Sequence, residues 1–274
     1  MNTKKIENLF SLKNKIILIT GAAGLLGQHH AEAVLKYEGK VILIDINKKK
    51  LQSLQNKLEK KYPKKVFSFC LDITNEKKVS NNCKLLNKKF GRLDGLVNNA
   101  AANPTMNSIK ESFALENFKL ENWNNDISIG LTGAFICTKY YGHLISTSSK
   151  KGSIVNISSD LGLIAPDQRI YPKKNNIKPV KPVSYSVSKF GIIGLTKYTS
   201  TYWCENNVRC NVMCPGGIKN SQDDKLINNI SKLVPLGRMA APNEYQGTLI
   251  WLLSDASSYL NGAIIPVDGG RTAW

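Results

Sequence analysis

The stretch Ile16-Ile-Leu-Ile-Thr-Gly-Ala-Ala-Gly-Leu-Leu-Gly27 decides the fold that this sequence predicts. Residues 16–20 form an apolar run typical of a buried strand, and a helix-like stretch at about 28–37 follows the glycines. A phosphate-binding loop requires this order of strand, glycine turn and helix. Small residues let the backbone approach a pyrophosphate, and the helix N-terminus offers unpaired N–H groups. Taken alone, the glycines also fit an ordinary tight turn.

A second apolar strand at 40–45 follows at the distance that a βαβ unit needs, and it ends in Asp45. An acid at this position can accept hydrogen bonds from both ribose hydroxyls and repels a 2′-phosphate, which favours NAD over NADP. Two alternatives stay open. Asp45 could be a solvated strand end, and Lys48, Lys49 and Lys50 could bind the phosphate of NADP.

Strand and helix patterns alternate along the rest of the chain, without repeats or a linker. This pattern predicts a single α/β domain over 1–274, a Rossmann-like doubly wound parallel sheet of about seven strands with helices on both faces. Two segments interrupt it, a Pro- and Lys-rich loop at about 165–182 and a mobile lid at about 217–234. Further strands are expected at 66–70, 95–98, 153–158, 208–213 and 263–267, and further helices at about 49–62, 76–90, 123–141, 185–205, 224–233 and 244–253.

The composition restricts the class of protein. No apolar run approaches the ~18 residues of a membrane span, and the N-terminus lacks the apolar region of a signal peptide. Six cysteines without a CxxC pair suggest reduced thiols in a cytoplasmic protein, with neither a disulfide framework nor a metal site. The net charge of +18 comes mostly from lysines spread along the chain, a pattern that favours solvated helix faces over nucleic-acid binding. Attraction of an anionic substrate also stays open.

The chemistry is expected at Tyr185-Ser-Val-Ser-Lys189. Residues four apart lie on the same face of a helix, so this spacing places the ammonium of Lys189 beside the phenol of Tyr185. A fixed cation favours the phenolate and lowers the pKa of the phenol, which makes it a proton donor and acceptor near neutral pH. An ordinary surface pair would give the same pattern.

Two further features accompany this pair. The stretch 152–162 predicts a buried strand that ends in the hydroxyls of Ser158 and Ser159, and Asn98-Asn99 follows the strand at 95–98, where amides can join neighbouring strands. Gly130 and Gly133 lie inside a predicted helix, where each costs about 1 kcal/mol relative to alanine, so a close-packing role is expected.

Together these residues resemble the short-chain dehydrogenase/reductase family over nearly the whole chain. The resemblance implies that Tyr185 is the acid/base, that Lys189 lowers its pKa and holds the nicotinamide ribose, and that Ser159, rather than Ser158, hydrogen-bonds the substrate oxygen. It implies a homodimer or homotetramer and no metal. It implies cofactor contacts from Gly21, Ala23, Gly24, Leu26, Gly27, Asp45, Asp72, Ile73, Asn99, Ala100, Ala101, Tyr185, Lys189, Pro215, Gly216 and Ile218.

Three features depart from the family pattern: two residues and the length of one segment. Gly130 stands where the family usually has an asparagine that supports a proton relay, and Asn220 stands where a threonine usually contacts the cofactor carboxamide. Ser159 and Tyr185 are 26 residues apart, about twice the usual gap, and the additional residues form the Pro- and Lys-rich loop.

This loop, the segment 129–135 and the C-terminal stretch 267–274 are similar to flagellin modification protein A-type oxidoreductases of bacterial surface-sugar synthesis. That resemblance implies an anionic sugar, phosphorylated or nucleotide-linked, as the substrate. Two alternatives are an enzyme for an uncharged polyol or a sugar acid, and an NAD-binding sensor without turnover. The loop either binds the phosphate or packs as a solvated basic segment. Its candidate substrate residues are Arg169, Lys173 and Lys174, with Lys178 and Lys181 as further cations.

Overall fold

The computed structural model describes residues 8–102, 113–149, 151–171 and 179–274. Within this part of the chain lies one seven-stranded sheet in the order β3-β2-β1-β4-β5-β6-β7. Every neighbouring pair of its strands is parallel. The prediction of a doubly wound parallel α/β sheet is confirmed. The strands are β1 (Ile16–Thr20), β2 (Lys40–Asp45), β3 (Val66–Cys70), β4 (Gly95–Asn98), β5 (Gly152–Ile157), β6 (Val208–Pro215) and β7 (Ile264–Val267).

Most helices lie where the sequence predicts them, and their boundaries differ at a few ends. The first begins at Leu25, directly after the glycine turn, and no side chain caps it at Gly24. The helices are α2 (Leu25–Lys36), α3 (Lys48–Lys61), α4 (Glu76–Phe90), α5 (Leu120–Ile127), α6 (Gly133–Cys137), α7 (His143–Ser148), α8 (Val183–Tyr202), α9 (Asp224–Ser231) and α10 (Gln246–Leu253).

The long helix expected at 123–141 is a longer, composite element. Two π-helical turns, Ser128–Thr132 and Thr138–Gly142, join α5, α6 and α7 into one run from 120 to 148. π-turns insert an extra residue into a helix and occur most often near functional sites. The first of them contains Gly130.

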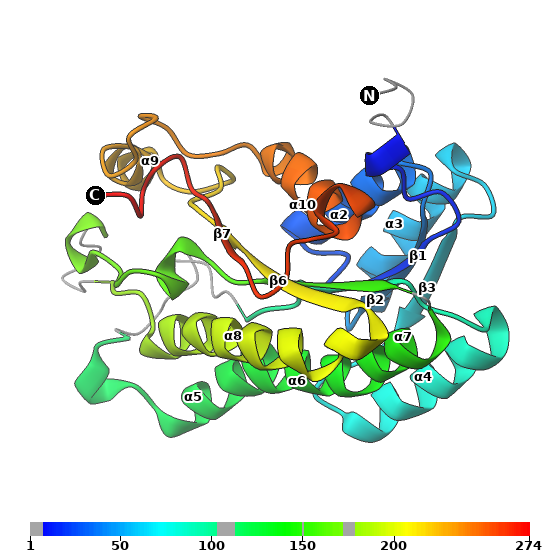
Figure 1. Ribbon diagram of the computed structural model, residues 1–274. Coiled ribbons are helices and arrows are strands. Elements are labelled where there is room, and N and C mark those ends of the chain that lie inside the picture. Colours follow the sequence, from blue (N-terminus) through cyan, green and yellow to red (C-terminus); the bar gives the residue numbers. More distant parts are fainter. Residues whose placement is uncertain (1–7, 103–112, 150, 172–178) are drawn as a thin grey trace.

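Helices cover both faces of the sheet (Figure 1). Helices α2, α3 and α10 pack on one face, and α4 to α8 pack on the other. Within β1, Ile17 and Ile19 belong to the first of these cores, whereas Ile16 and Leu18 belong to the second. Because both faces of the strand are buried, its sequence is continuously apolar instead of alternating. No helix in the described residues is long and apolar enough to cross a membrane.

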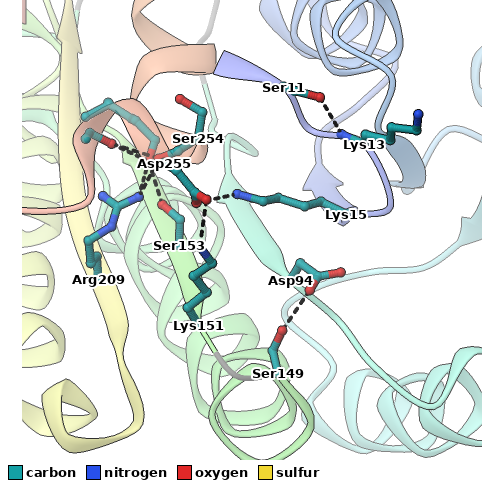
Figure 2. Close-up of polar contacts among 12 residues, drawn as sticks. Ser11, Lys13, Lys15, Asp94, Ser149, Lys151, Ser153, Arg209, Ser254 and Asp255 are labelled. Atoms are coloured by element: carbon teal, nitrogen blue, oxygen red, sulfur yellow. Dashed lines mark hydrogen bonds and ion pairs between the residues drawn. The ribbon is translucent and has the colours of Figure 1, made fainter. Parts of the chain in front are cut away.

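The amino ends of the central strands are joined by polar contacts (Figure 2). The Asp94 carboxylate is buried just before β4 and accepts hydrogen bonds from the Ile16 backbone N–H at 2.9 Å and from the Ser149 hydroxyl at 2.7 Å, and it pairs with Arg92. Nearby, the more exposed Asp255 pairs with Lys15 and Lys151. Asp94 therefore ties β1 and β4 to the segment that leads into β5.

We expect Asp94→Ala to lower the free energy of unfolding by about 3 kcal/mol, because it leaves a buried backbone N–H and a guanidinium without their acceptor. Asp255→Ala removes a more exposed carboxylate at the same end of the sheet and is expected to cost about 1 kcal/mol or less. Urea denaturation of both variants measures the difference. Equal losses in the two variants would contradict the structural role of Asp94.

Candidate active site

A cavity of about 580 Å³ opens at the carboxyl ends of the strands. Every strand from β1 to β6 contributes residues at or just beyond its end, and β1 and β4 lie side by side there although β2 and β3 separate them in sequence. In open parallel sheets a crevice at such a crossover point binds nucleotides. The predicted cofactor residues that line it are Gly21, Gly24, Leu26, Asp45, Asp72, Ile73, Asn99, Ala100, Ala101, Tyr185, Lys189, Pro215, Gly216 and Ile218.

The glycine turn packs closely against the chain just after β4 and leaves no room for a side chain at Gly21. Gly21 has a φ of +60°, and a Cβ there would lie 2.7 Å from the Ala100 Cα. The N-terminus of α2 faces the cavity through Gly24, Leu25 and Leu26, and no side chain caps Gly24. The free N–H groups of a first helical turn and the positive end of its dipole suit a pyrophosphate. The residues present therefore fit a dinucleotide.

Ala23 and Gly27 are not among the lining residues, and they act behind the cavity wall. The Ala23 backbone N–H donates to the Asp45 carboxylate at 2.9 Å, which fixes the loop against the end of β2. A Cβ at Gly27 would lie 2.2 Å from the Gly21 carbonyl oxygen. These two residues shape the loop, and Asp45 both orders it and lines the cavity.

The Asn98-Asn99 pair joins neighbouring strands, as its position predicts. The Asn98 amide donates to the Asn156 side chain at 2.8 Å, and the Asn99 amide donates to the backbone oxygens of Thr20 and Gly21 at 2.9 and 3.0 Å. The first bond connects β4 to β5, and the other two hold the glycine turn.

Ser158 and Ser159 have different roles. The Ser158 hydroxyl is buried and donates to the Lys189 carbonyl at 2.7 Å, so it anchors α8. The Ser159 hydroxyl lines the cavity, donates to the Asp160 carboxylate at 2.7 Å and accepts from the Leu161 N–H. Of the two hydroxyls, only that of Ser159 also lines the adjoining cavity where a substrate would enter.

Tyr185 and Lys189 lie on α8, one helical turn apart, and both line the cavity. The Lys189 Nζ is 5.8 Å from the Tyr185 ring centroid and donates to the Ile157 carbonyl at 2.9 Å. This bond to the end of β5 fixes the ammonium between the phenol and the sheet. Ser159, Tyr185 and Lys189 therefore meet at one place in the fold.

The pKa of Tyr185 moves in the direction opposite to the one that its spacing from Lys189 predicts. Burial raises the pKa of the phenol to about 12, a hydrogen bond with Ser159 lowers it, and the Asp160 carboxylate raises it further. Burial also lowers the pKa of the Lys189 ammonium to about 8, and the charge of Lys181 adds to this fall. Desolvation of the buried site is the largest cause of both shifts.

Gly130 and Gly133 lie in close-packed places, which confirms the expectation from the sequence. A Cβ at Gly130 would lie 3.2 Å from the Cβ and Oγ of Ser188, between Tyr185 and Lys189 on α8. A Cβ at Gly133 would lie 2.6 Å from Ile73 Cδ1. The absence of a side chain at Gly130 thus lets the π-turn approach α8 closely.

A second cavity of about 290 Å³ adjoins the first and shares Ser159 and Tyr185 with it. Its charged lining residues are Asp160, Asp167, Lys181 and Arg271, and Asn220 lies at its wall. Leu226 and Ile230 of α9 form part of the side that the sequence assigns to a lid.

The candidate substrate residues of the loop differ in their surroundings. Arg169 is exposed, forms a two-bond pair with Asp167 at 2.8 and 2.9 Å, and is not a lining residue of the second cavity. Lys173 and Lys174 lie outside the described residues. The sequence motifs did not identify Asp160 or Arg271. Asp160 could have been found because it directly follows the serine that ends β5, whereas only the folded chain brings Arg271 from the C-terminus to this cavity.

Comparisons with known proteins agree with this geometry. The family model described as Enoyl-(Acyl carrier protein) reductase matches residues 21–272. The chain is 32% identical to 3-oxoacyl-(acyl-carrier-protein) reductase FabG of Thermotoga maritima, over 94% of this chain and 98% of that protein. It is 30% identical to post-translational flagellin modification protein A of Campylobacter coli, over 94% and 98%.

A solved structure is also similar over most of the chain. It is a short-chain dehydrogenase from Leptospira borgpetersenii with bound NAD+, 30% identical, with a TM-score of 0.80 and coverage of 96% of this chain and 94% of that one. The fold, the grouping of Ser159, Tyr185 and Lys189, and these matches together show that the chain belongs to the short-chain dehydrogenase/reductase family of oxidoreductases.

Proposed function

We propose that the chain is an NAD(H)-dependent oxidoreductase that interconverts a hydroxyl and a ketone on an anionic sugar. The sugar would be phosphorylated or nucleotide-linked, and the pathway would be bacterial surface-glycan synthesis of the flagellin-glycan or nonulosonate type. One observation carries the proposal: Ser159 and Tyr185 lie on the wall between two cavities, of which the first fits a dinucleotide and the second contains cations.

The preference for NAD is supported by the surroundings of Asp45. Asp45 lines the cavity at the end of β2, where its negative charge would repel a 2′-phosphate. Lys48, Lys49 and Lys50, which could instead attract that phosphate, are exposed at the start of α3 and are not among the residues that line the cavity. The Leptospira relative was solved with NAD+.

Each catalytic residue has a role that its position supports. In the oxidation, the Ser159 hydroxyl holds the substrate oxygen and the phenolate of Tyr185 accepts the proton of the substrate hydroxyl. The Lys189 ammonium stabilises the phenolate from the side of β5. The bound nicotinamide supplies the chemistry of hydride acceptance or donation. In the reduction, Tyr185 returns the proton to the oxygen that becomes a hydroxyl.

The anionic substrate is supported by the charges of the second cavity. Asp167 is paired with Arg169, so Lys181 and Arg271 outnumber the remaining carboxylate of Asp160. An excess of cations in a partly desolvated site favours a phosphate or a carboxylate. The flagellin modification relative supports a sugar-glycan role. All six cysteines are free, which suits the reducing cytoplasm.

A panel of paired substrates tests the proposal. Each sugar is offered plain, phosphorylated and nucleotide-linked, in both directions, with NAD(H) and NADP(H) in parallel. We expect kcat/KM to be at least about tenfold higher for an anionic sugar than for its uncharged partner, since one charge-assisted contact contributes about 1.5–3 kcal/mol. We also expect NAD(H) to be preferred over NADP(H).

Each of the other possible results would contradict one part of the proposal. Equal or better turnover of the uncharged partner would discard the anionic substrate and keep the oxidoreductase. A preference for NADP(H) would overturn the role of Asp45. Tight binding of NAD+ without turnover of any substrate would favour a sensor.

A further inference from the structure

The backbone of Lys181 is held in place by Gln168, just before α8 begins. Its backbone N–H donates to the Gln168 side-chain oxygen at 2.8 Å, and its carbonyl accepts from the Gln168 side-chain nitrogen at 3.3 Å. One glutamine side chain therefore clamps both sides of the residue. Two residues after the Lys181-Pro182 junction, the Ser184 hydroxyl bonds to Asp126 of α5, which fixes the start of the helix.

This placement puts the Lys181 ammonium on the face of the catalytic phenol. The Lys181 Nζ lies 3.8 Å from the Tyr185 ring centroid, closer than the 5.8 Å of the Lys189 Nζ. A cation within about 6 Å of an aromatic face is attracted to the ring. The same cation also favours negative charge on the phenolic oxygen of that ring.

The other charged and titratable groups near this site lie on several elements. Asp160, after β5, acts on Tyr185, Lys181 and Tyr171, and Asp126 of α5 acts on Lys181. Cys214 of β6 and Lys181 act on Lys189, and Arg271 acts on Asp160. Burial lowers the pKa of the Lys181 ammonium to about 8, and the two carboxylates oppose this fall, so the group is cationic at neutral pH.

We propose that Lys181 is a second cation of the catalytic centre, which acts through Tyr185 and promotes the loss of one proton to solvent from the Tyr185–Lys189 pair. To accept a proton from a substrate hydroxyl, the pair must first hold one proton fewer than phenol plus ammonium. Because the two groups are coupled, that proton belongs to the pair, whichever group releases it. The charge of Lys181 disfavours the fully protonated pair and offsets the opposite effect of Asp160.

This inference rests on the proposed function only in using the same Tyr185 chemistry, and it can be tested without a substrate. The nicotinamide ring of NAD+ is positively charged, and the cavity that fits the cofactor is lined by Tyr185 and Lys189. By linkage, the affinity for NAD+ rises as the pair loses its proton. Calorimetric titration of NAD+ at a series of pH values therefore gives the midpoint of that proton loss.

We expect Lys181→Met to move this midpoint upward by about one pH unit, a tenfold loss of affinity below the midpoint. Lys181→Arg keeps the charge and is expected to restore the wild-type midpoint. Lys225→Met, at an exposed lysine of α9, makes the same change in net charge and is expected to leave the midpoint unchanged. Where the panel yields a substrate, the acidic limb of its oxidation profile shifts with the midpoint.

A loss of affinity that is equal at all pH values, with the midpoint unmoved, would show that Lys181 is only a structural contact. Should Lys181→Met fail to fold, Lys181→Gln removes the charge with a polar side chain and is expected to raise the midpoint in the same way. An unchanged or lowered midpoint in Lys181→Gln overturns the proposal. Failure of every sugar in the panel would refute the proposed substrate. It would not affect the midpoint that the NAD+ titration measures.

Discussion

The Tyr185→Phe variant is expected to lose about 10³-fold in kcat, because it removes the only atom by which this side chain can transfer a proton. The phenol lies at the wall between the two cavities, one helical turn from Lys189, and Ser159 lines the same wall. The ring itself stays, so the cation on its face and the packing of α8 are retained. Steady-state nicotinamide absorbance with the best substrate of the panel measures kcat.

The control for this variant lies on the same helix. Tyr198 is exposed on α8 and stacks on Tyr202, away from the cavities, so Tyr198→Phe is expected to keep wild-type kcat. Calorimetry of NAD+ binding separates an effect on the chemical step from an effect on cofactor binding. We expect the affinity of Tyr185→Phe for NAD+ to change by about threefold or less, because an uncharged hydroxyl at a binding site contributes little. Retained turnover would assign the acid/base role to another group.

The Gly27→Ala variant is expected to weaken NAD+ binding by about 100-fold, since a displaced loop loses several backbone contacts to phosphate, each worth roughly 1–3 kcal/mol. The added Cβ would lie 2.2 Å from the Gly21 oxygen, 2.7 Å from the Ala22 Cα and 2.8 Å from the Ala22 oxygen. All three are backbone atoms, so the whole turn must move and no side chain can yield instead. Calorimetry with NAD+ measures the loss.

A glycine in the same helical layer provides the matched control. A Cβ at Gly247 of α10 has nothing within 4 Å, so Gly247→Ala is expected to keep NAD+ affinity and to raise the free energy of unfolding by about 0.5–1 kcal/mol through helix propensity. If Gly27→Ala binds NAD+ as well as the Gly247→Ala control, the loop does not bind the pyrophosphate as proposed.

The regular parts of the fold were predictable because their signals are local. The apolar runs of β1 and β2, the glycine turn between β1 and α2, and the alternation of strands and helices all depend on residues within about ten positions of one another. Helix ends were less predictable, since the composite helix of 120–148 continues through two π-turns, of which the first packs against α8 and the second against β4.

The candidate site likewise has a part that follows from the sequence and a part that depends on packing. A four-residue spacing is enough to place Tyr185 and Lys189 on one face of α8, and the serine at the end of β5 lies beside them because parallel strands end at one edge of the sheet. The net direction of the Tyr185 pKa could not be derived from this spacing. Desolvation depends on every atom packed around the phenol, and the Asp160 charge adds to it.

The sequence by itself determined the parallel α/β sheet, the dinucleotide loop and the Ser159, Tyr185 and Lys189 group, because each depends on short-range spacing and on the common edge where strands end. Only the tertiary structure decided which cations lie near this group. Arg169 turns to Asp167 at the surface, while the Gln168 clamp places Lys181 on the Tyr185 ring and chain folding brings Arg271 to the same cavity. Such contacts join residues distant in sequence, and electrostatic energy depends on distance and burial in three dimensions, which a linear pattern does not contain.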